Sequence, residues 1–158
     1  MSVTVRQAVA ADALAATHIL RRSISQLCVA DHRNDPGRLE SWLQDKTVSN
    51  VVAWIASVDN YCVVASINDS ICGFGAMTVE GEIMLCYVDP TARFRGVSAA
   101  MLDELEHKAR GLGLPAVHLN GTATARRFYE NRGYLPAGQT NEVFKSIACQ
   151  SMVKRFAP

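Results

Sequence analysis

The sequence predicts an α/β (α+β) fold, in which a mixed and mostly antiparallel sheet carries helices on both faces. Three observations point to this class. Apolar residues recur at helical spacing across residues 11–28, and three strand-like runs separated by tight turns occupy residues 61–88. An amphipathic helix then leads to another short strand, and strands joined by a helical crossover run parallel. We therefore expect a central parallel pair, splayed apart at one end.

The composition fits one globular domain spanning residues 1–158. No apolar run approaches the roughly 18 residues of a membrane span, and residues 1–9 lack the apolar core of a signal peptide, so we expect a cytoplasmic protein without a membrane partner. The net charge of +1 gives no general attraction to nucleic acid.

The cysteines are scattered and odd in number. Their positions contain no Cys-x-x-Cys spacing, which argues against a zinc site and against a disulfide framework. We expect reduced thiols that pack as small apolar side chains, and no metal site. The five are Cys28, Cys62, Cys72, Cys86 and Cys149.

The N-terminal third predicts one strand followed by helices. Residues 3–7 alternate apolar and polar, and the helical spacing of 11–28 ends at a segment, 31–37, that is rich in turn-forming residues. Residues 38–44 predict a second short helix. The segment 49–57 fits a third helix, but its β-branched residues also suit a strand, so both remain open.

The middle of the chain predicts an antiparallel meander and then a helix. Strands are expected at 61–67, 71–79 and 82–88, the last ending before Pro90, which cannot continue a strand ladder. A helix with one apolar stripe follows Gly96. Its other stripe is charged and comprises Asp103, Glu104, Glu106, Lys108 and Arg110.

The C-terminal part predicts the parallel step. Residues 116–119 form a short strand after the helical crossover, parallel to the strand that ends at Val88. A short helix through Arg132 follows, with Thr122 or Thr124 as its cap. The last strands, expected to be antiparallel, are at 134–136 and 143–153.

A short basic loop lies between the strand that ends at Val88 and the next helix. Within residues 87–102 the spacing is Arg93-x-x-Gly96-x-Ser98, which places free backbone N–H groups at a helix start, where they can bind an anion. The pattern resembles the acetyl-CoA loop of the GNAT superfamily of N-acetyltransferases, Arg/Gln-x-x-Gly-x-Gly/Ala, with Ser98 as the last small residue.

A second motif carries the same resemblance. Residues 122–134, Thr-Ala-Thr-Ala-Arg-Arg-Phe-Tyr-Glu-Asn-Arg-Gly-Tyr, are similar to the family's Asn-x-x-Ala-x-x-Phe/Leu-Tyr-Glu-x-x-Gly-Phe/Tyr segment, with Thr122 where Asn is common. The order of predicted elements also resembles the GNAT fold over essentially the whole chain. The resemblance implies direct acetyl transfer from acetyl-CoA to a primary amine of a small molecule or peptide.

The resemblance also implies where acetyl-CoA binds. Loop amides and arginines would hold the pyrophosphate, and the pantetheine would pair with a strand backbone in the slot between the parallel strands. Asn120 or Thr122 would bind the pantetheine amides. The full expected set is Cys86, Tyr87, Val88, Arg93, Phe94, Arg95, Gly96, Val97, Ser98, Ala99, Asn120, Thr122 and Arg126.

Tyr129 is the predicted general acid. A phenol with a pKa near ~10 is protonated at neutral pH and can donate a proton to a leaving thiolate. The family commonly uses the tyrosine at this motif position for that purpose. The neighbouring Phe128 is expected to pack the helix onto the sheet.

Glu82 is a candidate general base. It stands as far before the basic loop as the catalytic glutamate in the family's histone acetyltransferases, which it resembles in position. By strand alternation Glu82, Met84, Cys86 and Val88 should share one face, directing Glu82 along the slot. A solvated hairpin glutamate is the competing interpretation, and both remain open.

The sequence gives less information about the residues that bind the acceptor amine. Asp31 and His32 lie between the first helices, where this fold builds a wall of the acceptor site, so they are candidate substrate-binding residues; a solvated loop is the alternative. A non-catalytic acyl-CoA-binding domain is the alternative function. An exposed edge strand makes a homodimer a further expectation.

Overall fold

The computed structural model describes residues 2–143 and 147–158. The N-terminal part contains one strand and mostly helices: β1 (Val3–Gln7), η1 (Ala10–Asp12), α1 (Ala13–Leu27), α2 (Val29–His32), α3 (Pro36–Leu43) and α4 (Val48–Ala56). The remainder alternates strands with helices: β2 (Asn60–Ile67), β3 (Ser70–Thr78), β4 (Ile83–Val88), η2 (Pro90–Ala92), α5 (Val97–Gly111), β5 (Ala116–Thr122), α6 (Ala123–Asn131), β6 (Leu135–Val143) and β7 (Ile147–Arg155).

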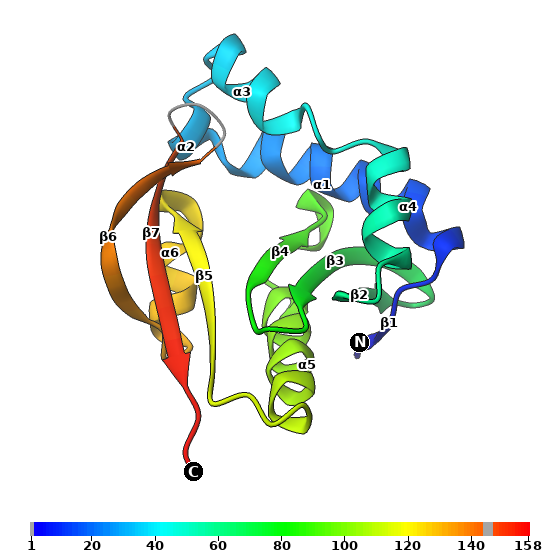
Figure 1. Ribbon diagram of the computed structural model, residues 1–158. Helices are drawn as coiled ribbons and strands as arrows, with labels where there is room; N and C mark the ends of the chain where they lie inside the picture. The colour runs from blue at the N-terminus through cyan, green and yellow to red at the C-terminus, as the bar shows by residue number, and fades with distance from the viewer. Residues whose placement is uncertain (1, 144–146) are drawn as a thin grey trace.

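The strands form two antiparallel sheets that meet at β4 and β5. The first sheet has the order β1-β2-β3-β4 and the second the order β5-β7-β6. A parallel bridge between Glu82 and His118 joins them, with the His118 N–H donating to the Gly81 carbonyl at 2.9 Å. Figure 1 shows the two sheets side by side, with β4 and β5 as facing edges. The predicted parallel pair of β4 and β5 is therefore confirmed. The two strands diverge directly after the bridge between Glu82 and His118.

Helices cover both faces of the first sheet, as predicted. Helix α5 packs on one face around Val63, Met101 and Leu105, and α1 and α4 pack on the other around Leu20 and Phe74. A Cβ at Gly73 would lie 2.8 Å from the Val97 side chain, so the glycine permits the close approach of α5.

Strand β4 contains a bulge that the sequence pattern did not reveal. Ala76 pairs with Leu85 but Met77 pairs with Ile83, which leaves Met84 as the extra residue. Ile83 therefore packs on the α5 side. The prediction that Glu82 shares a face with Cys86 is wrong, because the extra residue reverses the alternation before it.

The structure resolves one open alternative and changes two local predictions. The segment 49–57 is helical, and the Thr47 side chain accepts a hydrogen bond from the Asn50 amide at the start of α4. Part of the predicted turn at 31–37 is the short helix α2. Glu106, expected on the charged stripe, is buried.

Among the described residues, no helix combines the length and the apolar character needed to cross a membrane.

Candidate active site

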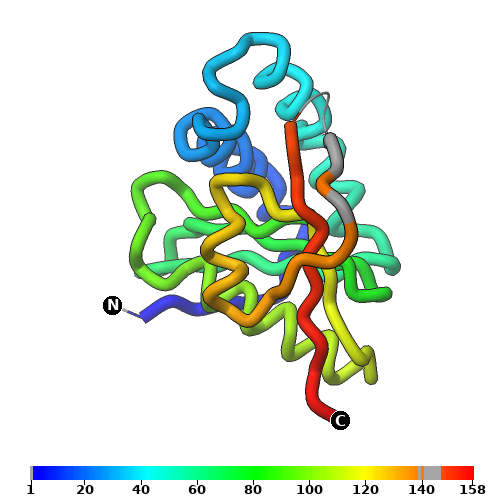
Figure 2. The backbone as a smooth tube through the Cα atoms, turned by 90° about the vertical axis from the view of Figure 1, so that its left-hand side faces the viewer, coloured from blue at the N-terminus to red at the C-terminus, as the bar shows by residue number. Residues whose placement is uncertain are grey.

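A cavity of about 390 Å³ lies between the diverging strands β4 and β5, and we call it the slot. Its walls come from these two strands, from residues 93, 94 and 96–99 of the loop and helix start, from α6, and from Ser23, Leu27 and Cys28 on and just after α1. Figure 2 shows the turn between β4 and α5 on the same side of the molecule as α6. The volume is within the range of small-ligand sites.

One end of the slot is the N-terminus of α5. Gly96 occupies its N-cap position with φ of 79°, and no side chain of the described residues caps the helix. The first amides of α5 are therefore available for an anion, and Arg93 stands beside them in the slot lining. Asp89 anchors the loop, because its carboxylate accepts hydrogen bonds from the Thr91 amide at 2.9 Å and from Arg22 at 2.8 Å.

Phe94 carries two unusual features in this loop. Its backbone has φ of 63°, in the left-handed region that disfavours residues with a side chain, and its side chain is 91% exposed. The Arg93 guanidinium lies 4.6 Å from the centre of the Phe94 ring. Such local strain is concentrated at functional sites, which agrees with the position of Phe94 in the slot lining.

Tyr129 lies inside the slot and is only 7% exposed. Its ring packs edge-on against Phe128 and Tyr134, with centroid distances of 5.3 and 5.5 Å. Burial, followed by the neighbouring Cys86, raises the pKa of the Tyr129 phenol well above its ordinary value, so the hydroxyl stays protonated.

The Cys86 thiol donates to the Ser98 carbonyl oxygen at 3.8 Å, and Cys86 and Tyr129 both line the slot. Burial raises the pKa of the Cys86 thiol to about 12, which leaves almost no thiolate at neutral pH and makes it a poor nucleophile. All five cysteines are free, and four of them are buried. Cys28 and the half-buried Cys86 line the slot.

Asp31 caps helix α6 from a distant part of the chain. Its carboxylate accepts hydrogen bonds from the Ala123 amide at 2.8 Å, from the Thr124 amide at 3.3 Å and from the Thr124 hydroxyl. Thr122 is at the N-cap position, but its side chain makes no cap hydrogen bond. The cap expected from Thr122 or Thr124 is therefore supplied by Asp31.

His32 is fully buried, and both of its ring nitrogens have partners. Nε2 contacts the Ile24 carbonyl at 2.9 Å, and Nδ1 accepts from the Asn34 amide at 3.0 Å. The expectation of an exposed, polar loop at Asp31 and His32 is wrong, because both side chains are buried in contacts within the fold. Neither lines the slot.

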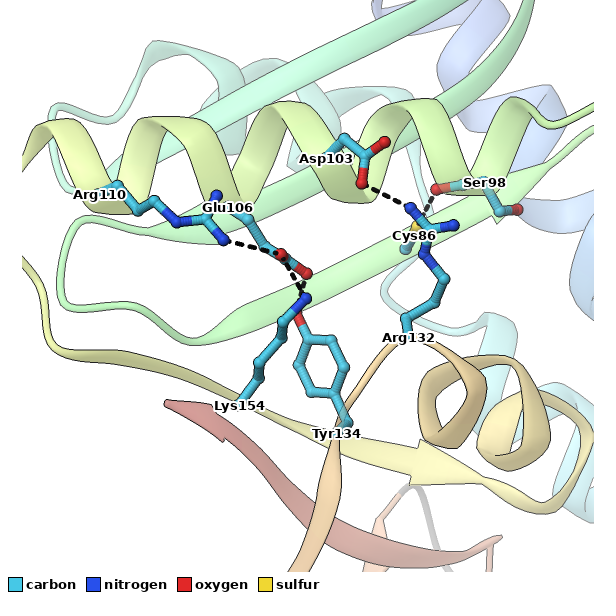
Figure 3. A network of polar contacts seen from close by, with 8 residues as sticks. All are labelled: Cys86, Ser98, Asp103, Glu106, Arg110, Arg132, Tyr134 and Lys154. Carbon is cyan, nitrogen blue, oxygen red and sulfur yellow. Dashed lines mark hydrogen bonds and ion pairs between the residues drawn. The ribbon is translucent and has the colours of Figure 1, made fainter. Parts of the chain in front are cut away.

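A buried polar network fixes the second sheet to α5 (Figure 3). The Glu106 carboxylate accepts from the Tyr134 hydroxyl at 2.8 Å and from Lys154 Nζ at 2.8 Å. The exposed carboxylate of Asp103 accepts from Arg132 at 2.6 Å. Because Tyr134 also packs against Tyr129, the network holds the α6 side of the slot at a set distance from α5.

Glu82 does not line the slot but lies in a second cavity. This cavity, the open-face groove, has a volume of about 430 Å³ and is bounded by Glu82, β5, β7 and Ala137. The bulge at Met84 is the reason, since it directs Glu82 to the face that His118 and Asn120 also occupy. The groove and the slot share Leu119 and Asn120 in their linings, so they border each other along β5.

Most of the predicted coenzyme residues come together. All of them line the slot except Arg95 and Arg126, which are exposed outside it; Arg126 lies 3.9 Å from Glu130. The sequence reading assigned no site role to the α1 wall or to the groove residues His118 and Arg155, because no local pattern marks which distant segment will face a cavity. The described residues contain no cluster of three or more His, Cys, Asp or Glu side chains able to hold a metal ion.

Comparison with known proteins agrees with this geometry. A family model described as "Acetyltransferase (GNAT) domain" matches residues 21–156. A GCN5-related N-acetyltransferase from Rhodopseudomonas palustris superposes with a TM-score of 0.89 at 23% identity, covering 99% of this chain and 97% of that one. Curated protein sequences gave no match.

Two further solved structures contain the coenzyme. PaiA N-acetyltransferase from Thermoplasma acidophilum, in complex with coenzyme A, has a TM-score of 0.79 and 16% identity over 99% of this chain and 100% of that one. YncA from Salmonella typhimurium, with its cofactor acetyl-CoA, has a TM-score of 0.74 and 18% identity over 100% and 98%.

The fold and the slot thus define a GNAT-type acyltransferase. The chain belongs to the GNAT acetyltransferase family.

Proposed function

We propose that this chain moves the acetyl group of acetyl-CoA directly to a primary amine of a small molecule or peptide, in the slot between β4 and β5. The single observation that carries the proposal is the alignment within one cavity of an uncapped helix N-terminus, an unpaired strand edge and a protonated tyrosine. These features match the phosphates, the amide-containing pantetheine and the thioester in the order in which CoA carries them.

The strand edge supplies the pantetheine site. Beyond the bridge at Glu82, β4 is the edge of its sheet, so its backbone groups on the slot side have no strand partner among the described residues. An extended ligand with amides can pair with such an edge as another strand would. The amides of Val97 to Ala99 and the Arg93 guanidinium then lie where the pyrophosphate follows.

Tyr129 assists departure of the thiolate. The amine nitrogen attacks the thioester carbonyl, the C–S bond breaks, and the Tyr129 hydroxyl donates its proton to the sulfur, while the proton released by the amine leaves through Glu82 or solvent. The raised pKa of the phenol keeps the donor protonated but makes transfer to the thiolate uphill. The step therefore depends on the prompt return of a proton to Tyr129.

Thiol release from acetyl-CoA in the presence of polyamines, aminoglycosides, amino acids or peptides tests the function. We expect acceptor-dependent release, and in Tyr129→Phe a kcat lowered on the order of 100-fold with the CoA dissociation constant within about twofold of wild type. Tyr61→Phe is the matched control, because the Tyr61 hydroxyl bonds Glu104 outside the slot.

Wild-type turnover in Tyr129→Phe would remove the acid assignment. CoA binding without transfer to any amine would instead indicate a non-catalytic acyl-CoA-binding domain. Absence of CoA binding would contradict the proposed function altogether.

A further inference from the structure

We infer that the open-face groove binds the acceptor, and that the acceptor is an elongated primary amine whose far end carries a carboxylate, as in a short peptide with a free C-terminus. This assignment rests on the proposed function. It deepens that function by naming the class of acceptor and the residue, Arg155, that selects it.

The position of the groove makes it an approach to the slot. Asn120 and Leu119 line both cavities, and the Asn120 side chain lies 3.1 Å from the Ser151 hydroxyl on the groove face. A ligand in the groove therefore has one end at the boundary with the slot, where the thioester would lie. The helices leave this face of the second sheet open, because α6 packs on β5 and β7 from the α5 side.

The pairing of β5 with β7 shows the order in which the lining residues follow one another along the groove. Asn120 pairs with Ser151, His118 with Val153, and Ala116 with Arg155, while Glu82 pairs with His118 from the other side. From the slot boundary the groove thus passes Glu82 and reaches Arg155. Arg155 follows Ser151 by four positions along β7, a distance of about 14 Å at about 3.4 Å per residue.

The charges at these two positions are opposite and uncompensated. Glu82 is the carboxylate and Arg155 the guanidinium among the lining residues, and within the described parts of the chain neither forms an ion pair. A cationic amine is attracted to Glu82, near the slot. A carboxylate is the natural partner of Arg155, because the planar guanidinium binds it through two parallel hydrogen bonds.

The spacing sets the length of the acceptor. An extended peptide covers about 3.3–3.6 Å per residue, so a tripeptide spans about 10 Å, and the Arg155 side chain can span the remaining distance to its carboxylate. A single amino acid is too short to use both charged residues. The groove therefore favours peptides over free amino acids.

The test compares triglycine with triglycinamide as acceptors in the thiol-release assay. In wild type we expect kcat/KM for triglycine to exceed that for the amide by on the order of 10 to 100-fold, mainly through KM, because the amide lacks the charge-assisted hydrogen bonds to Arg155. Arg155→Gln should abolish this preference without changing the KM of acetyl-CoA. Arg155→Lys, which keeps the charge, should restore part of it.

Arg38→Gln is the matched control, because Arg38 lines neither cavity. A preference for triglycine that survives in Arg155→Gln would overturn the assignment, as would a wild-type enzyme that accepts acid and amide equally. CoA binding with transfer to other amines but not to triglycine would also overturn it while leaving the proposed function intact. Failure of CoA to bind, measured by calorimetry, would remove both.

Discussion

At the scale of single residues, Asp31 connects two helices that are far apart in the sequence. It follows α1 by a few positions, and its carboxylate binds the first amides of α6, 92 and 93 residues further on. A carboxylate at a helix N-terminus satisfies free N–H groups and interacts favourably with the helix dipole. Because α6 carries Tyr129, the position of the predicted acid depends on Asp31.

We predict that Asp31→Ala destabilises the protein by about 1–2 kcal/mol, the usual cost of losing a helix cap. It should also lower kcat, because α6 loses its anchor to α2. Asp35→Ala is the control, since Asp35 caps α3 through the Arg38 amide at 2.9 Å but has no contact with the slot. Urea denaturation and steady-state kinetics on both variants measure the two effects; equal activities would refute the positioning role.

At the scale of secondary structure, one additional residue in β4 determines which cavity Glu82 faces. Without the bulge at Met84, Glu82 would lie on the α5 side with Cys86. With it, Glu82 faces the groove beside His118, on the side from which we propose that the acceptor arrives. The bulge therefore places the candidate base, Glu82, and the candidate acid, Tyr129, in different but adjoining cavities.

Helix α5 offers a second prediction at this scale, because two of its acids bind cations of the C-terminal region. Glu106 is buried, whereas the Asp103 side chain is 65% exposed. Glu106→Gln should destabilise the protein by about 1–3 kcal/mol, since it weakens the bonds to Tyr134 and Lys154.

Asp103→Asn is the matched control and should cost at most about 1 kcal/mol, because exposed ion pairs contribute little. Urea midpoints of the two variants provide the comparison. Similar losses from both substitutions would contradict the importance of burial.

At the scale of the whole molecule, the two sheets are joined by α5, by the Glu106 network and, among residues 2–143 and 147–158, by the backbone bridge between Glu82 and His118. CoA in the slot would contact both sheets at once and would bind the folded state alone. At 100 times its dissociation constant such a ligand stabilises by about 2.7 kcal/mol. For a chain of this size we predict a rise in Tm of about 5–10 °C.

A thermal-denaturation series with CoA measures this shift. Pantetheine, which lacks the phosphates, and adenosine bisphosphate, which lacks the pantetheine, are the controls, and each should stabilise less than CoA at equal concentration. An equal shift from either fragment would show that the ligand does not need both the slot and the α5 N-terminus.

Periodicity determined much of the architecture. The spacing of apolar residues located the helices and strands, and a helical crossover made the β4–β5 step parallel, because both rules depend on neighbours in the sequence. The Arg93-x-x-Gly96 loop could be predicted from the sequence for the same reason, since a helix start and its free amides are local features. These local rules also predicted the helices on both faces of the sheet.

Which side chains meet depends on contacts between distant parts of the chain. Asp31 looked like a loop acid and caps α6; Glu106 looked exposed and is buried; Glu82 was expected along the slot and lies in the groove. Each outcome depends on a partner many residues away or on a bulge that shifts alternation by one position, and neither leaves a periodic trace in the sequence. Local sequence patterns were therefore sufficient for the family and for the position of the basic loop at the start of α5. The packing of the two sheets and the bulge in β4 determined the cap of α6, the direction of Glu82 and the presence of Arg155 in a groove that adjoins the slot.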